Sequence, residues 1–389
     1  MKKILLLGAG FVLLFAQEYR TFERQVLEKA PEIEALHLQR DVARLEGEKR
    51  LRYDNPSLEV EGSRFDADAG GDENGWRAAL NQPFRVFGLG DDLKAYAQAL
   101  QTIAATGYEK GVAAMKRELR TLYTGYVLAV RQKALLKERT ALAERLERIA
   151  QERFREGGGT KARVMQASLQ RIDAESKLLE QERRIQARYY ALLKAAQTEG
   201  HPSLAAAFLY PVEKVETVKG PANPSLAQLE AESKRYEAES KVNDRSVKSW
   251  NLFTEYEEEP DQSIARIGVG VALPLFNRNA QERQIASIRA KQKRLEALKL
   301  RRQQRVQIAS LKSRLENLAR TYRTLEKQKK KLEALLALFT EGYKTSQISL
   351  LDLIETQKSL IETKGRLLQT QYLANLYRIN IEYLEGTLQ

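Results

Sequence analysis

This chain of 389 residues contains short stretches in which apolar and polar residues alternate and long stretches with a helical pattern. Apolar and polar residues alternate over 55–65 and 76–84, on either side of the turn-rich segment DADAGGDENG. A second alternating pair, 250–259 and 263–276, flanks the short turn PDQ. Alternation with a period of two is typical of strands, and Gly, Pro, Asp and Asn favour the turns between them. The pattern therefore predicts two β-hairpins, over 57–84 and 250–276.

The segments that follow each hairpin have a helical pattern. No proline occurs between 88 and 153, a length that reaches ~100 Å at 1.5 Å per residue. Apolar residues within this stretch recur at spacings of four and three, as in a coiled-coil seam: Leu119, Tyr123, Tyr126 and Val130. We expect long helices over 88–200 and 280–385.

The order of these elements is repeated along the chain. Three pairs of corresponding residues have nearly the same separation: Pro31 and Pro224 by 193, Pro83 and Pro274 by 191, and Phe154 and Tyr343 by 189. An internal repeat of this size fixes the architecture before any local motif is considered. We interpret 17–205 as a first structural repeat, 206–220 as a linker and 221–389 as a second repeat.

The first residues have the pattern of an export signal. Lys2 and Lys3 precede an apolar run over 4–15, which is short for a permanent membrane-spanning helix. We predict a signal peptide over 1–16 with cleavage near Ala16; the alternative is a buried helix of a cytosolic protein. Export places the mature chain outside the cytoplasm.

Composition narrows the chemistry that the chain can perform. It has no Cys, and its two His residues, His37 and His201, lie in different segments without the spacing of metal ligands. No Ser/His/Asp set or phosphate-binding loop occurs, and GGG at 157–159 lacks the Lys-Ser/Thr that a phosphate loop needs. We therefore predict neither an enzyme nor a resident metal or cofactor.

The net charge of +13 raises the possibility of nucleic-acid binding. However, Lys and Arg alternate with Glu along the helical stretches, and no patch of basic and aromatic residues appears. We predict no nucleic-acid partner.

The last predicted strand has one apolar face and one small or polar face. The apolar face consists of Ile267, Val269, Val271 and Leu273, and the other face contains Arg266, Gly268, Gly270 and Ala272. A membrane-spanning strand needs this alternation, although a soluble sheet with one face on a core shows it too. Because four strands are too few to close a cylinder, the membrane interpretation requires an oligomer. We predict that Ile267, Val269, Val271 and Leu273 contact lipid.

Several segments together resemble the TolC family of outer-membrane efflux channels. They are NQPFRVFG and LPLFNRNAQERQIASIRA, which lead into long helices, and YKTSQISLLDLIETQKSL at the end of the second long helix. The run Pro-Leu-Phe-Asn-Arg-Asn is similar to the branch that exports heavy-metal cations. The resemblance covers essentially the whole mature chain.

The resemblance implies a mainly α protein with a transmembrane β part. It implies a homotrimer in which a 12-stranded β-barrel in the outer membrane joins an α-helical tunnel, or α-barrel, in the periplasm. Its implied partners are outer-membrane lipid, a periplasmic adaptor protein and, through the adaptor, an inner-membrane transporter. The implied function is a passive duct for metal ions or small toxic compounds in a tripartite efflux system. A periplasmic coiled-coil adaptor or scaffold, and the exit duct of a type I protein secretion system, remain the alternatives.

Two sets of candidate site residues lie where the long helices reverse direction. The predicted adaptor-docking tips contain Phe154, Gly157, Thr160, Tyr343, Ser346 and Ser349. Asp352 and Glu355 are three apart, so on a helix they share a face, and they match the acidic constriction of the family. Arg163 corresponds to Asp352 by the separation of 189 and is the predicted ionic partner across neighbouring tips. We expect these three residues to form a periplasmic gate; solvated carboxylates without a role are the alternative.

Overall fold

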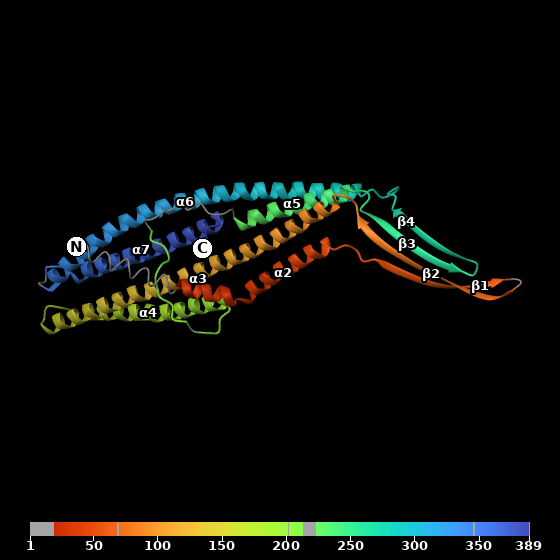
Figure 1. Cartoon of the computed structure of the whole chain (residues 1–389). Coiled ribbons are helices and arrows are strands. Elements are labelled where there is room, and N and C mark those ends of the chain that lie inside the picture. The colour runs from red at the N-terminus through yellow and green to blue at the C-terminus, as the bar shows by residue number, and fades with distance from the viewer. Residues whose placement is uncertain (1–18, 68–69, 201, 213–222, 345–346, 389) are drawn as a thin grey trace, which may run out of the picture. The chain divides into compact units, whose positions relative to one another are not determined.

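The computed structural model describes residues 19–67, 70–200, 202–212, 223–344 and 347–388. Residues 19–29 are helical. The elements that follow are α2 (Pro31–Leu51), β1 (Ser57–Ala67), β2 (Gly70–Arg85), α3 (Leu89–Arg155), α4 (Lys161–Ala196), α5 (Pro224–Asp244), β3 (Ser249–Glu259), β4 (Gln262–Val271), α6 (Ala280–Lys344) and α7 (Leu350–Glu385) (Figure 1). The predicted signal peptide, 1–16, lies outside the described residues.

The duplication predicted from the sequence is visible in the lengths and ends of the elements. Helices α2 and α5 each have 21 residues, and α4 and α7 each have 36. The N-cap residues of α4 and α7 are Thr160 and Ser349, whose hydroxyls accept hydrogen bonds from the backbone three residues on. Both helices end in a left-handed residue, Gln197 and Gly386. Each cap pair is 189 residues apart, so the duplicated, mainly helical fold is confirmed.

The four strands form one antiparallel sheet in the order β1-β2-β3-β4 (Figure 1). The two predicted hairpins are therefore present. They are joined by the pairing of β2 with β3, in which Leu80 lies opposite Thr254. The end of the second hairpin differs from the prediction, because β4 stops at Val271 and Leu273 lies beyond it. Pro274 has no N–H to donate to a neighbouring strand, and the Leu275 N–H turns back to the Leu273 carbonyl at 2.9 Å.

The chain divides into two compact units, and each takes residues from both repeats. One unit contains 35–110 and 224–302, that is α2, the sheet, α5 and parts of α3 and α6. Its helical parts lie side by side in the order α2, α3, α5, α6 (Figure 1). Gly47 of α2 approaches Ala97 of α3, Lys110 of α3 donates to Gln228 of α5, and Ser233 of α5 donates to the Ala290 carbonyl of α6. The helices thus follow the same order as the strands.

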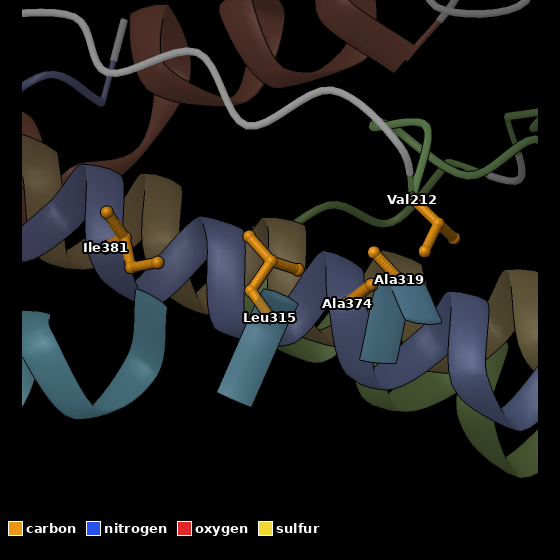
Figure 2. Packing of buried hydrophobic residues seen from close by; sticks show 5 residues of the cluster. All are labelled: Val212, Leu315, Ala319, Ala374 and Ile381. Atoms are coloured by element: carbon orange, nitrogen blue, oxygen red, sulfur yellow. The ribbon is translucent and has the colours of Figure 1, made fainter. Parts of the chain in front are cut away.

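The other unit contains the described residues of 1–34, 111–223 and 303–389. Its helices pair as α4 on α3, α3 on α7 and α7 on α6, as shown by Arg139–Asp173, Lys364–Glu138 and Lys312–Glu385. Residues 202–212 have no helix or strand, yet Val212 packs in a core cluster of α6 and α7 with Leu315, Ala319, Ala374 and Ile381 (Figure 2). The described part of the predicted linker is therefore packed against the unit, and 213–220 lie outside the described residues.

Candidate functional site

One face of the sheet carries apolar side chains that nothing in the described chain covers. Leu58, Leu80, Thr254 and Ile267 are partners across the four strands, and such partners share a face. Ile267 is 76% exposed and Val269 is 66% exposed. The exposed apolar residues of this face are Leu58, Val60, Trp76, Leu80, Tyr256, Ile267, Val269 and Val271. This apolar face extends over all four strands.

The opposite face is charged and is linked by ion pairs between strands. Arg77 of β2 contacts Glu61 of β1 and Glu255 of β3, each at 3.1 Å. Arg266 of β4 pairs with Glu255 and, at 2.6 Å, with Glu257 of β3. The sheet thus has an apolar and a charged face, as the alternation in its sequence predicts.

An aromatic ring fills a gap on the charged face. Gly268 lies opposite Phe253, and a Cβ atom added at Gly268 would be 2.4 Å from the Phe253 ring. A Cβ atom at Gly270, on the same face of β4, would meet nothing within 4 Å. Gly268 therefore allows the ring of Phe253 to lie across β4.

The turn between α3 and α4 forms the first predicted tip. Gly157 has a φ of +78°, a conformation that favours glycine. The Gly158 N–H donates to the Arg153 carbonyl at 2.9 Å and closes the end of α3. Phe154 is 46% exposed, so its ring is available to a partner. Thr160 accepts from the Arg163 N–H at 3.4 Å and starts α4.

The second tip joins α6 to α7. The Gln347 N–H donates to the Gly342 carbonyl at 2.8 Å. Ser349 starts α7: its hydroxyl accepts from the Asp352 N–H at 3.2 Å and donates to the Asp352 carboxylate at 2.6 Å. The serine hydroxyl therefore caps the backbone of the first turn and also binds the Asp352 carboxylate. Ser346 lies outside the described residues.

Tyr343 does not fit the surface role that we predicted for it. Its side chain is 1% exposed and packs in a cluster with Leu146 and Leu353. The Arg153 guanidinium lies over its ring at 4.7 Å, so Tyr343 ties the end of α6 to the end of α3. The prediction failed because an aromatic residue beside a turn has the same sequence signal whether it packs inward or outward.

The three predicted gate residues are all exposed. Asp352 and Glu355 lie in the first turns of α7, and Arg163 lies in the first turn of α4. Within the described part of this single chain no ion pair joins Arg163 to Asp352. The predicted contact between neighbouring tips is therefore not made within one chain, and a contact between tips of neighbouring chains stays a proposal.

A groove runs beside the tips, between α3, α4 and α7. Its volume is ≈ 510 Å³. The apolar part of its lining comes from α3 and α7, with Leu142, Ala143, Leu146, Ile354 and Ile361. Charged side chains of all three helices also line the groove, among them Arg139, Asp173, Lys177, Lys358 and Glu362.

A buried ionic network, which the sequence did not indicate, holds the second unit together. Arg120 of α3 donates to both carboxylate oxygens of Glu23, at 2.8 and 2.9 Å, and to the Tyr210 hydroxyl at 3.1 Å. Tyr210 donates to Glu382 of α7, and its N–H donates to Asn375 at 2.9 Å. The network therefore joins helix 19–29, α3, residues 202–212 and α7.

The pKa values of this network reflect its burial. Burial would lower the pKa of Arg120, but the hydrogen bonds and charge of Glu23 raise it above its ordinary value. Burial raises the pKa of Tyr210; Arg120 opposes this shift and Glu382 adds to it. At neutral pH the network therefore contains a charged arginine and an un-ionised tyrosine.

The described residues lack the features of two other kinds of site. None of their helices combines the length and the apolar character that crossing a bilayer requires. They also contain no group of three His, Cys, Asp or Glu residues placed to hold a metal ion.

Comparison with known proteins gives matches of fold. No family model and no curated protein matches the sequence. Among solved structures, CusC, described as forming a transmembrane channel, matches with a TM-score of 0.76 and 16% identity over 95% of this chain and 92% of its own. The outer-membrane protein VceC of Vibrio cholerae matches with a TM-score of 0.75 and 14% identity, over 95% of this chain and 96% of its own. The Campylobacter jejuni CmeC outer-membrane channel matches with a TM-score of 0.72 and 14% identity, over 95% of this chain and 86% of its own.

Proposed function

We propose that this chain, which has the fold of the TolC-type outer-membrane channels, is the outer-membrane component of an efflux system. The observation that carries the proposal is the two-faced sheet. Its apolar face fits the acyl chains of a bilayer, and its charged face fits a water-filled interior. A soluble scaffold or adaptor would leave the apolar face in water, where exposed apolar area of this extent is unusual.

Closure of the sheet requires further copies of the chain. Strands β1 and β4 are the edges of the sheet, and unpaired backbone groups are costly in hydrocarbon. The helices α2 and α6, which adjoin these edges, carry exposed apolar stripes: Leu38, Val42 and Leu45 on α2, and Ile285, Ile288 and Leu295 on α6. We infer that three copies join edge to edge, with β1 and α2 of one copy against β4 and α6 of the next.

Substitution of one lipid-facing residue tests the placement of the sheet. An arginine in place of Val269 would face the acyl chains and cost about 2–4 kcal/mol near the middle of the bilayer. We therefore expect Val269→Arg to lower the amount of chain that fractionates with outer membranes, whereas Val269→Leu leaves it unchanged. Equal recovery of the two variants would place this face outside the membrane.

The tips provide the surface on which a periplasmic adaptor would dock. Phe154 is exposed at the first tip, and the groove between α3, α4 and α7 has an apolar lining with charged residues around it, which suits an amphipathic helix. Because the chain has no cysteine, Phe154→Cys can carry a single photo-crosslinker. We expect it to capture the adaptor, and Leu179→Cys, exposed farther along α4, to capture less. If only Leu179→Cys captured the adaptor, the docking surface would lie away from the tips.

The cargo proposed for this duct is metal ions or small toxic compounds, in line with the resemblance of residues 274–279 to the heavy-metal branch. A wide water-filled duct needs few specific contacts, so the inner-membrane transporter selects the cargo. Loss of the chain should sensitise cells to such compounds. Loss of a secreted protein, with unchanged sensitivity, would favour a type I secretion duct instead.

A further inference from the structure

Large apolar side chains stand uncovered where the two hairpins lead into the long helices. Phe87, between β2 and α3, is 100% exposed, and Phe276, between β4 and α6, is 101% exposed. Leu273 and Leu275 are also exposed, at 71% and 68%. Uncovered apolar groups gathered at equivalent points of the fold indicate a surface that something else covers.

The segment after β4 presents these side chains on a defined turn. The Leu275 N–H donates to the Leu273 carbonyl at 2.9 Å and closes a tight turn around Pro274. Directly after Phe276, the Asn277 side chain begins a second turn by accepting from the Asn279 N–H at 3.0 Å. Local hydrogen bonds therefore hold the backbone on both sides of Phe276, while its ring contacts none of the described chain.

The segment after β2 is held by a cation instead. Arg245 donates to the Phe87 carbonyl at 2.9 Å and to Asp92 at 2.7 Å. Gly88 has a φ of +81°, and a Cβ atom there would lie 2.8 Å from the Arg245 guanidinium. The backbone at Phe87 is thus fixed, and only its ring is left uncovered.

Both segments begin where the apolar face of the sheet ends. At the end of the sheet next to the helices, Phe84 stacks on Trp250 with 4.8 Å between the ring centroids, and Trp250 lies opposite Val271. Phe87 follows Phe84 by three residues, and Leu273 follows Val271 by two. Arg278, which is exposed, comes two residues after Phe276. Apolar groups next to a cation suit the boundary between acyl chains and phosphate headgroups.

We propose that Phe87 and the turn 273–276 insert into the phospholipid leaflet that meets the helical end of the sheet and anchor the channel at that depth. The inference rests on the proposed function, which places the apolar face of the sheet in lipid. Phe and Leu would lie below the headgroups, and the Arg278 guanidinium would lie beside their phosphates.

Nitroxide labels on single cysteines can locate these residues, since the natural chain has no cysteine. The full chain would carry the label at Phe87→Cys or Phe276→Cys and be reconstituted in phospholipid vesicles. Collision rates with oxygen, which concentrates in lipid, and with a water-soluble nickel chelate would be measured. Ile267→Cys is the control for the lipid-facing strand, and Leu338→Cys, exposed on α6, is the control for water.

We expect the labels at 87 and 276 to favour oxygen over nickel, as at 267, but at a shallower depth than 267. If 267 favours oxygen while 87 and 276 respond to nickel as 338 does, the anchor is refuted and the proposed function stands. Immobilised labels that neither reagent reaches would also refute it, because a protein partner would then cover the site. Nickel access at 267 itself would refute the proposed function.

Discussion

Arg120 shows how much of this structure depends on a single buried charge. Its side chain is 7% exposed, and its nearest counter-ion, Glu23, is 6% exposed. An arginine that loses this carboxylate retains the cost of desolvation and loses most of the attraction that offsets it, because its other carboxylate partner, Glu382, is farther away at 3.6 Å.

We therefore expect Glu23→Gln to destabilise the folded chain by about 3–5 kcal/mol. The measurement is the shift in thermal unfolding followed by circular dichroism. Glu28→Gln is the matched control, because Glu28 lies in the same helical segment and is exposed. The account of the network would be wrong if the two variants unfolded at the same temperature.

The residues that escaped sequence-based prediction are those whose roles depend on distant contacts. Glu23 and Arg120 are 97 residues apart, and no local pattern indicates their pairing. The packing of Tyr343 against Leu146 joins residues that are even farther apart in sequence. Gly268, by contrast, was predicted to lie on the small or polar face of its strand, but only the structure reveals the Phe253 ring across it.

The first turn of α7 combines a helix cap with the predicted gate. Asp352 bonds to Ser349 through both its N–H and its carboxylate, so its removal would also weaken the start of the helix. Asparagine retains an oxygen acceptor at this position without the charge. Asp352→Asn is therefore a sharper test of the gate than alanine.

In planar bilayers we expect the double substitution Asp352→Asn, Glu355→Gln to weaken the preference for cations, because it would remove the ring of carboxylates that we propose at the periplasmic entrance. Arg163→Ala should raise the resting conductance by removing a partner of Asp352 in a neighbouring chain. Glu362→Gln, farther along α7 and exposed, serves as the control. Unchanged selectivity and conductance in all the variants would place the gate elsewhere.

At the scale of elements, the sequence correctly predicted the strands and helices whose pattern is local. Alternation over a few residues predicted both hairpins, and the absence of proline predicted the long helices. The predicted end of β4 was too far along the chain. The apolar alternation continues to Leu273, but strand pairing stops at Val271, before the turn around Pro274. Alternation identifies a face, but hydrogen bonding decides where a strand stops.

At the scale of the whole molecule the sequence predicted the duplication but not the division into compact units. The caps of α4 and α7 keep the separation of 189 residues, as the sequence indicated. The compact units instead take parts of both repeats, because helices of the two halves pack beside one another: α3 contacts α5 in one unit and α7 in the other. Such pairing joins residues that are far apart in sequence, so periodicity within one segment cannot reveal it.

The central claim is that one chain supplies only part of a closed wall. In the described sheet β1 and β4 are edges, and the adjoining helices α2 and α6 carry exposed apolar stripes. The most direct test is native mass spectrometry of the protein extracted from outer membranes in mild detergent. We predict a homotrimer that resists dissociation, since each copy covers the open edges of its neighbours. A stable, uniformly monomeric chain under these conditions would contradict the account.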